Sequence, residues 1–552
     1  MDAPAGTDDG RHRILILGGG FAGVYTAKFL ASGLRRAERA RVEITIVSNE
    51  NYMVFQPLLP EVVSGTIEML HVITPIRRMA RAAQLYTREI EAIDVRRKRV
   101  RLAPGFVPRP MELEYDELVV CLGTQLNFDL VPGMREHALP FKYLGDALRL
   151  RNDAVHVLEE ADIEQDPEEK RKLLTFVVAG GGFSGVECMA ELHDFLHSAV
   201  RAYENIAPEE LNCILVQSGQ RILPELQEQL ALYAQRILTK RGIDLRLNTR
   251  MTAVSADAVI VTDKTTQAQT VIPTRTMITT VPAKPHPLVA ALPVEHEGGR
   301  IRVTEFLNVP EMSDIWAVGD CAAVPQKDGI FSPPTAQHAL RQARTCADNI
   351  LARMRGEAMQ SFAFTGLGSL ASLGSRSAVA EVMGVRLRGF VAWVAWRAIY
   401  LMKFPGLDRQ IRIAVDWTLD FILPRDITQL RIFQPDPIHN EHFHAGELVF
   451  DDGDFGDKLY VILEGEADIE KDGTVLTTLG QEEVFGEAAL ISDRPRGAAV
   501  RARTALDVLS VSRPSFQKLI GHMPGTRASI EEIMIERGMD PRQMDAIEEA
   551  AE

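Results

Sequence analysis

Short apolar runs and helical patterns alternate in the first part of the chain. An apolar run at residues 14–17 precedes the glycine-rich segment 18–23, a helical pattern to Leu30 and a second apolar run at residues 42–47. This order predicts a strand, a tight turn, a helix and a parallel strand. The same order recurs with a strand at 174–179, a turn at 180–185, a helix to about residue 196 and a strand at 212–216. The chain is therefore predicted to contain two α/β units of one type.

Both turns have the spacing GxGxxG, with glycines at positions 18, 20 and 23 and again at 180, 182 and 185. In this pattern the first glycine permits the turn, the second lets a pyrophosphate approach the backbone, and the third lets helix and strand pack closely. The helix N-terminus then offers free N–H groups to the phosphates. Because the pattern occurs twice in the required context, we predict two dinucleotide sites rather than two empty turns.

The second strand of each unit lacks the usual acid that holds a ribose hydroxyl. Ser48 stands at that position in the first unit, with Glu50 two residues later, and Gln217 stands there in the second. An amide can bond a ribose hydroxyl without repelling a 2′-phosphate as a carboxylate does. NADPH is therefore not excluded as the dinucleotide of the second site.

Length, charge and residue composition argue against several classes of protein. The chain has 552 residues, which is too many for one hydrophobic core, and its net charge of −15 argues against binding nucleic acid. The N-terminus has no apolar signal region, so export is not expected. None of the five cysteines forms a CxxC pair, so neither a zinc cluster nor a dithiol centre is predicted. No apolar run reaches the ~18 residues of a membrane-spanning helix.

Five segments in order carry a family resemblance. They are NYMVFQPLLP at 51–60, YDELVVCLG at 115–123, GFSGVE at 182–187, IWAVGDCA at 315–322 and PPTAQHALRQ at 333–342. Together they resemble the type II NADH dehydrogenases, single-chain NADH:quinone oxidoreductases, over roughly residues 13–425. The resemblance implies two nested Rossmann-like domains, with FAD on the first turn and NAD(P)H on the second, and a membrane quinone as electron acceptor.

The resemblance also implies which residues bind. The FAD contacts expected from it and from the turn are Gly18, Gly20, Gly23, Ser48, Glu50, Gly123, Asp320 (to the ribityl chain) and Ala336. The NAD(P)H contacts expected are Gly180, Gly182, Gly185, Gln217 and Pro282. The residues expected at the reacting groups are Glu187, near the nicotinamide and flavin, and Gln337 and Gln342, at the quinone head group.

For each of these three residues, an ordinary structural role without a part in the reaction remains an alternative. Glu187 is also a first-turn helix acid favoured by the dipole, and both glutamines are also ordinary helix-face residues. Two departures from the family bear on the quinone site: Arg341 stands where a second glutamine is common, and Leu367 stands where a lysine is common. The quinone type and the proton route are therefore left open.

Two alternative functions remain. Sulfide:quinone reductase has the same fold but needs a cysteine pair at the flavin, and neither Cys188 nor Cys321 is suitably placed in sequence. A redox-sensing signalling flavoprotein with little turnover is the other alternative.

Residues 386–425 are rich in tryptophan, with Trp393, Trp396 and Trp417, and carry an excess of basic residues. Amphipathic helices of this composition lie in the bilayer interface and favour anionic lipid. We expect peripheral, monotopic binding at the cytoplasmic face of the cell membrane. A homodimer interface, which is compatible with this, or a covered core uses the same residue types.

Past about residue 430, short β-runs with Gly and Asp turns resemble a cyclic-nucleotide-binding β-roll. FGEAALISDRPRGAAV at 485–500 resembles its phosphate-binding cassette. There Gly486 and Gly497 offer backbone donors, Glu487 accepts the ribose 2′-hydroxyl and Arg496 pairs with the cyclic phosphate. A β-roll that has lost its ligand is the alternative. We expect cAMP, ahead of cGMP, as a regulatory ligand.

The expected domain boundaries follow. They are an FAD domain at 11–145 and 300–385, the latter with the quinone-site helix, an NAD(P)H domain at 146–299, an amphipathic anchor or dimerisation segment at 386–425 and a cyclic-nucleotide-binding domain at 430–545.

Overall fold

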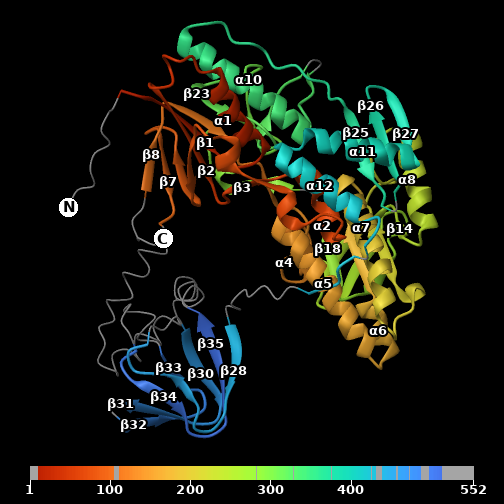
Figure 1. Cartoon of the computed structure of the whole chain (residues 1–552), viewed down its shortest axis with the longest axis vertical. Coiled ribbons are helices and arrows are strands. Elements are labelled where there is room, and N and C mark those ends of the chain that lie inside the picture. The colour runs from red at the N-terminus through yellow and green to blue at the C-terminus, as the bar shows by residue number, and fades with distance from the viewer. Residues whose placement is uncertain are drawn as a thin grey trace. The chain divides into compact units, whose positions relative to one another are not determined.

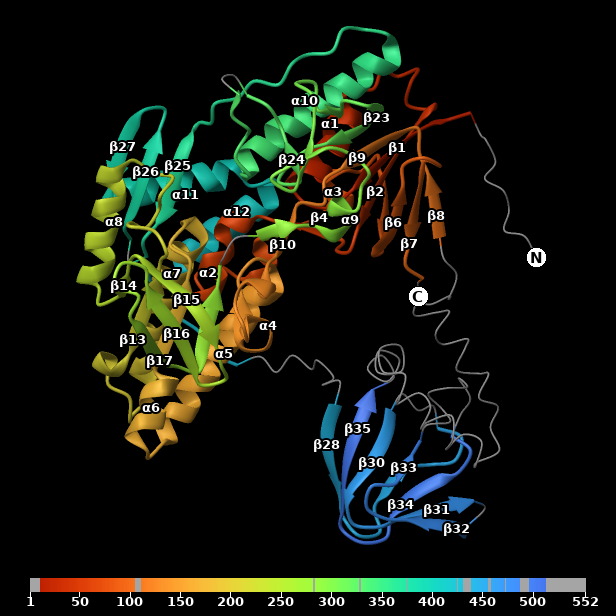
Figure 2. The ribbon, with the colours of Figure 1, turned by 180° about the vertical axis from the view of Figure 1, so that it is seen from behind.

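The computed structural model divides the chain into two compact units, residues 1–430 and 431–552, which are described separately (Figures 1 and 2). The residues that the structure describes are 10–104, 111–280, 283–326, 329–374, 376–423, 425–429, 438–454, 458–471, 473–486 and 496–512.

The first sheet of the larger unit has the strand order β22-β23-β9-β1-β2-β5. Its strands are β1 His12–Leu17, β2 Val42–Ser48, β5 Gln84–Thr87, β9 Glu117–Val120, β22 Asn308–Val309 and β23 Met312–Ala317. β1 pairs in parallel with β2 and β9, and β9 with β23. Helices α1 (Phe21–Gly33) and α10 (Ala336–Arg355) pack side by side, as both views show (Figures 1 and 2).

The second sheet has the order β11-β18-β12-β13-β14, and all its pairs are parallel. Its strands are β11 Ala138–Pro140, β12 Thr175–Ala179, β13 Asn212–Val216, β14 Asp244–Arg246 and β18 Thr276–Thr279. The long helices of this part are α5 Leu144–Ile163, α7 Phe183–Ala199 and α8 Glu228–Lys240. This sheet lies in sequence between the two stretches that build the first sheet, which confirms the predicted nested α/β architecture.

The central strands of both sheets are buried. Residues Ile14 to Leu17 of β1 are at most 2% exposed, and Phe176 and Val177 of β12 are fully buried. Parallel strands covered on both faces read as continuous apolar runs, because neither face meets water. Each such aliphatic side chain contributes roughly 1.5–3 kcal/mol when it leaves water. The apolar runs that predicted these strands are thus the centres of the two hydrophobic cores.

Smaller elements complete the sheets and their connections. The remaining strands up to residue 323 are β3 Tyr52–Val54, β4 Ile73–Pro75, β6 Ile90–Asp94, β7 Arg99–Leu102, β8 Met111–Glu114, β10 Thr124–Leu126, β15 Thr249–Val254, β16 Ala258–Asp263, β17 Gln269–Pro273, β19 Ala283–Pro285, β20 His296–Glu297, β21 Arg300–Arg302 and β24 Ala322–Ala323. The short helices are α2 Leu59–Val63, α3 Ile76–Met79, α4 Met134–His137, α6 Pro167–Leu173 and α9 Pro287–Ala290.

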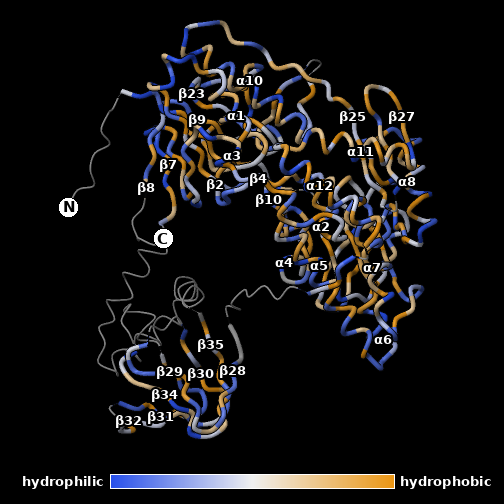
Figure 3. The backbone as a smooth tube through the Cα atoms, viewed as in Figure 1, coloured by the Kyte–Doolittle hydropathy of each residue, from blue (hydrophilic) through white to orange (hydrophobic). Residues whose placement is uncertain are grey.

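Two helices follow an antiparallel sheet near the end of this unit. The sheet consists of β25 Gly368–Ser372, β26 Ala378–Val382 and β27 Val385–Arg388, and the helices are α11 Gly389–Lys403 and α12 Leu407–Leu419. Hydrophobic positions recur along both helices (Figure 3). Among the described helices, none combines the length and the apolar character needed to cross a bilayer.

The smaller unit is a β-structure, as predicted. Its described residues form two four-stranded sheets, with the orders β28-β35-β30-β33 and β29-β34-β31-β32. The strands are β28 Ile438–Phe443, β29 Leu448–Phe450, β30 Lys458–Glu464, β31 Ala467–Lys471, β32 Thr474–Leu479, β33 Val484–Phe485, β34 Ala499–Ala502 and β35 Leu506–Ser512. The smaller unit has its own hydrophobic core, in which the rings of Tyr460 and Phe485 stack with 5.1 Å between their centroids.

Candidate functional site

The first glycine turn connects β1 to α1 and leaves room for a ligand at one position. A Cβ at Gly18, whose φ is 116°, would lie 2.3 Å from the Cys121 carbonyl oxygen, and a Cβ at Gly23 would lie 2.0 Å from the Gly18 oxygen. A Cβ at Gly20 would meet nothing within 4 Å. No side chain caps the N-terminus of α1. The outer glycines thus permit the turn, and the middle one faces open space where a phosphate can approach.

The polar residues predicted for FAD lie around this turn. Ser48, at the end of β2, is buried beside Gly19 and accepts a hydrogen bond from the Glu50 N–H at 3.3 Å. Glu50 itself is exposed. Ser48 therefore orders the turn after β2. The exposed side chain of Glu50 bonds Tyr52 and is the more accessible of the two to a ligand.

Asp320 follows β23 and is held by a buried amide behind it. The Gly319 N–H donates to Gln342 Oε1 at 2.8 Å, and Gln342 is only 2% exposed. Burial raises the pKa of Asp320, and the positive charges of Lys142 and Arg300 oppose that rise. Gln342 thus orders the loop that carries Asp320, and its predicted contact with a quinone stays a prediction.

The second turn repeats the geometry of the first. A Cβ at Gly180, again with φ 116°, would lie 2.3 Å from Thr280 Oγ1, and one at Gly185 would lie 1.8 Å from the Gly180 oxygen. At Gly182 the nearest atom would be Glu225 Oε1 at 3.8 Å, and no side chain caps α7. The middle glycine of the second turn is thus the least crowded of the three, as in the first turn, which suits the approach of a phosphate to the N-terminus of α7.

Gln217 touches this second turn directly. Its Oε1 accepts from the Gly181 N–H at 3.1 Å, and its Nε2 donates to the Arg221 carbonyl at 3.2 Å. The amide thus braces the glycine loop in addition to any contact with a ribose. Pro282, the other residue expected here, lies outside the described residues.

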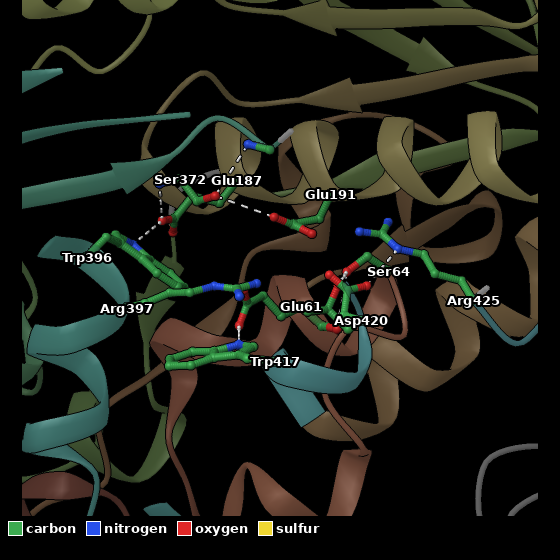
Figure 4. Close-up of polar contacts among 12 residues, drawn as sticks. Glu61, Ser64, Glu187, Glu191, Ser372, Trp396, Arg397, Trp417, Asp420 and Arg425 are labelled. Atoms are coloured by element: carbon green, nitrogen blue, oxygen red, sulfur yellow. Dashed lines mark hydrogen bonds and ion pairs between the residues drawn. The ribbon is translucent and has the colours of Figure 1, made fainter. Parts of the chain in front are cut away.

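Glu187 is buried on the first turns of α7 (Figure 4). Its Oε1 accepts hydrogen bonds from the Ser372 N–H at 2.8 Å and from Trp396 Nε1 at 3.3 Å. Burial raises the pKa of Glu187 to about 8, although both hydrogen bonds favour the ionised form and act against the rise. A carboxyl with such a pKa exchanges protons near neutral pH, which suits a group that works in general acid–base chemistry.

Two further buried carboxyls, which the sequence analysis missed, lie near Glu187 (Figure 4). Glu191 on α7 and Glu61 on α2 are 5% and 2% exposed. Glu61 Oε2 accepts from Trp417 Nε1 at 2.7 Å, and its Oε1 lies 3.3 Å from Arg397 Nη2. Burial raises the pKa of both carboxyls. The spacing of Glu187 and Glu191 by four residues was an available signal, because residues i and i+4 share a helix face.

Gln337 and Ala336 begin α10. Gln337 Oε1 accepts from the Leu367 N–H at 3.1 Å, and its Nε2 donates to the Gly368 carbonyl at 3.2 Å. Leu367, at the position where the family resemblance leads us to expect a lysine, is 38% exposed. Gln337 therefore holds the loop that leads into β25, and its proposed contact with the quinone stays a prediction.

The structure describes residues 485–486 and 496–500 of the expected cyclic-nucleotide cassette. Arg496, 6% exposed, donates through Nη1 to the Gly486 carbonyl at 2.5 Å and through Nη2 to the Lys458 carbonyl at 2.7 Å. Its guanidinium lies over the Phe450 ring at 4.1 Å. Gly497 is exposed, and Glu487 lies outside the described residues. Arg496 is thus placed at the cassette and held there by the β-roll.

Comparisons with known proteins agree with this geometry. Residues 12–343 match the profile of the pyridine nucleotide-disulphide oxidoreductases, residues 367–426 the NDH2 C-terminal domain, and residues 440–522 the cyclic nucleotide-binding domain. The demethylphylloquinone reductase NdbB of Synechocystis is 31% identical over 74% of this chain and 96% of its own length. The type II NADH:quinone oxidoreductase Ndh of Mycobacterium tuberculosis is 29% identical over 75% of this chain and 89% of its own. The chain belongs to the type II NADH dehydrogenase family.

Solved structures show the same fold. NDH2 from Plasmodium falciparum in complex with NADH has a TM-score of 0.70 at 19% identity, covering 76% of this chain and all of that one. The sulfide:quinone oxidoreductase of Aquifex aeolicus has a TM-score of 0.57 at 18% identity, covering 75% of this chain and 96% of that one. The family matches span the larger unit, and the smaller unit carries the match to the nucleotide-binding domain.

The residues present fit FAD in the first site of this family member. The open space at Gly20, the uncapped start of α1 and the half-buried Asp320 form a cradle for a pyrophosphate and a hydroxylated chain. All five cysteines are buried and free, which does not support a sulfide-oxidising disulfide. No group of three metal-ligating side chains occurs among the described residues.

Proposed function

We propose that this chain oxidises NADH and reduces a membrane quinone, without pumping protons. FAD, when bound, supplies the hydride-accepting and electron-transferring chemistry. The observation that carries the proposal is the pair of nested turns, each with an open middle glycine at an uncapped helix, in a chain of this family. We assign the first to FAD and the second to NADH.

Steady-state kinetics test this proposal directly. The purified full chain should be yellow and should oxidise NADH faster with ubiquinone or menaquinone analogues than with dioxygen alone. Absence of bound flavin would contradict the enzyme assignment. Bound flavin with slow turnover on every quinone would instead favour a redox-sensing protein.

Docking to a membrane is the second part of the proposal. Large hydrophobic side chains are exposed on α11, α12 and the residues after them, namely Phe390, Val391, Val394, Met402, Leu407, Ile411, Val415, Leu419, Phe421, Ile422 and Leu423. Basic residues flank these helices, as in interfacial helices that bind anionic lipid. A quinone is dissolved in the bilayer, so a surface of this kind at the cytoplasmic face would bring the enzyme to it. Co-sedimentation with anionic and neutral vesicles tests this, and light scattering tests whether the same surface forms a homodimer.

Regulation by a cyclic nucleotide, cAMP ahead of cGMP, is the third part. The β-roll fold, the family match and the buried Arg496 support a cyclic-phosphate site. Regulation requires a ligand whose affinity differs between two states of the protein. Calorimetry with cAMP and cGMP measures binding. NADH oxidation and vesicle binding at saturating nucleotide then measure any effect on rate or docking, and no change in either would contradict regulation.

A further inference from the structure

Three carboxyls lie along one face of α7. Glu187, Glu191 and Asp194 are spaced as i, i+4 and i+7, which places them in line on a helix. Glu187 and Glu191 are 7% and 5% exposed, and the side chain of Asp194 is 15% exposed. The line therefore runs along α7 from its N-terminal end, where the second glycine turn lies, to the half-buried Asp194.

Ser372 connects the two buried members of this line (Figure 4). Its backbone N–H donates to Glu187 Oε1 at 2.8 Å, and its hydroxyl donates to Glu191 Oε1 at 3.4 Å. Ser372 is itself 2% exposed. One residue at the end of β25 therefore contacts both carboxyls, and its hydroxyl both accepts and donates a proton.

The surroundings contain too few cations for all the carboxyls to be ionised together. The charged and titratable groups facing Glu187 and Glu191 are Glu61 on α2, Asp194 on α7, Arg241 after α8, Tyr400 on α11 and Arg425 after α12, with Arg397 on α11 paired to Glu61. Asp194 also pairs with Arg241. Ionising every carboxyl away from water is costly, so protons are held and shared within the group.

We propose that Glu191 passes protons between Asp194, the most exposed of the three carboxyls, and Glu187, at the reaction site, and that Ser372 holds Glu187 and Glu191 together by bonding one through its N–H and the other through its hydroxyl. This inference rests on the proposed function. NADH supplies two electrons and one proton as hydride, whereas reduction of a quinone to a quinol takes two electrons and two protons. The second proton comes from water. At each transfer an O–H bond of the donor breaks and one on the acceptor forms, and no electrons move. Glu191 acts through Glu187 and is not itself a catalytic residue.

Hydrogen–deuterium exchange of the Glu187 carboxyl tests the route without any quinone. In infrared spectra of the flavin-loaded full chain, the band of protonated Glu187 is the one lost in Glu187→Gln. After transfer to D₂O this band should shift about tenfold more slowly in Glu191→Gln than in the wild type. The loss of one proton-transfer step should slow exchange by a factor no larger than general acid–base catalysis contributes to a reaction rate. Ser372→Ala, which retains the N–H donor, should also slow it. Glu160→Gln, at an exposed position of α5, is the matched control. Wild-type exchange in Glu191→Gln overturns the proposal.

A second experiment measures the rates of flavin reduction and reoxidation by transient kinetics. Glu191→Gln should reduce its flavin with NADH at the wild-type rate, but reoxidation by quinone should slow about tenfold and recover when a small weak acid is added. Loss of both rates together, with no recovery, would indicate a structural role and overturn the relay. If the wild type reduces no quinone, the proposed function fails, while the exchange measurement still decides the relay.

Discussion

The indole of Trp396 donates a hydrogen bond to the carboxyl of Glu187, with 3.3 Å between Nε1 and Oε1. Glu187 belongs to the nucleotide-binding half of the fold, and Trp396 belongs to α11, within the segment expected to dock on a membrane. The next residue, Arg397, pairs with Glu61 of α2. One turn of α11 therefore contacts both buried acids, and changes there should alter proton affinity as well as packing.

Trp396→Phe should raise the pKa of Glu187 further, because the lost hydrogen bond favours the ionised carboxyl. The loss of one such bond should also cost about 1 kcal/mol of stability. The pH dependence of NADH oxidation and thermal unfolding measure the two effects. Trp393→Phe is the matched control, since the Trp393 ring lies over Arg397 at 4.2 Å instead. An equal change of the pH profile in both variants would contradict the assignment.

Stability should fall as pH rises toward 8. The folded pKa of Glu187 is about 8, above the ordinary value of 4.5, so between these values the folded chain holds a proton that the unfolded chain releases. Stability due to this proton is complete below the unfolded pKa and is lost as pH rises through the folded one, at up to roughly 1.4 kcal/mol per pH unit for one group. Denaturant unfolding across this range should show the slope, and Glu187→Gln should reduce it, while the raised pKa values of Glu61 and Glu191 maintain the remainder. The slope should persist in Glu160→Gln.

Arg397→Met should be strongly destabilising, by about 3–5 kcal/mol, because it leaves Glu61 buried without its cation. Adding Glu61→Gln should restore much of the loss, since the second change removes the uncompensated charge. A double-mutant cycle by denaturant unfolding measures the coupling. Additive losses would show that Arg397 acts mainly through its contacts with the rings of Trp393 and Trp417.

Gly182→Ala should fold normally and bind NADH more weakly, on the order of tenfold or about 1.4 kcal/mol. The new methyl would make only an ordinary contact, 3.8 Å from Glu225 Oε1, but would stand where a phosphate is expected to approach the backbone. Flavin content should not change, because FAD is assigned to the other turn. Gly185→Ala is the contrasting variant: its Cβ would lie 1.8 Å from the Gly180 oxygen, so the turn itself should be disrupted. Loss of flavin in Gly182→Ala would contradict the assignment of the two turns.

The nested sheets could be predicted because their strands are continuous apolar runs that end at glycine turns, and both signals are local. The predicted strand at 212–216 is β13, and the predicted run at 14–17 lies within β1. The contact between Glu61 and Arg397 could not be predicted in this way, since 336 residues separate the partners and neither has a local motif for the pair. Gln342 shows the same limit: its place in a recognisable segment is clear, but its burial behind Gly319 depends on how α10 packs.

Gln217→Glu should increase the preference for NADH over NADPH. A carboxylate at the end of β13 would bond a ribose hydroxyl and repel a 2′-phosphate, whereas the native amide does not repel it. The exchange keeps an acceptor for the Gly181 N–H but loses the donor to the Arg221 carbonyl, so a small loss of stability should accompany it. The measurement is kcat/KM for both nucleotides with one quinone acceptor. Gln217→Met, which has neither the charge nor the bond to Gly181, separates the two effects: it should lose stability without improving discrimination. A ratio unchanged in Gln217→Glu would show that Gln217 serves only to brace the glycine loop.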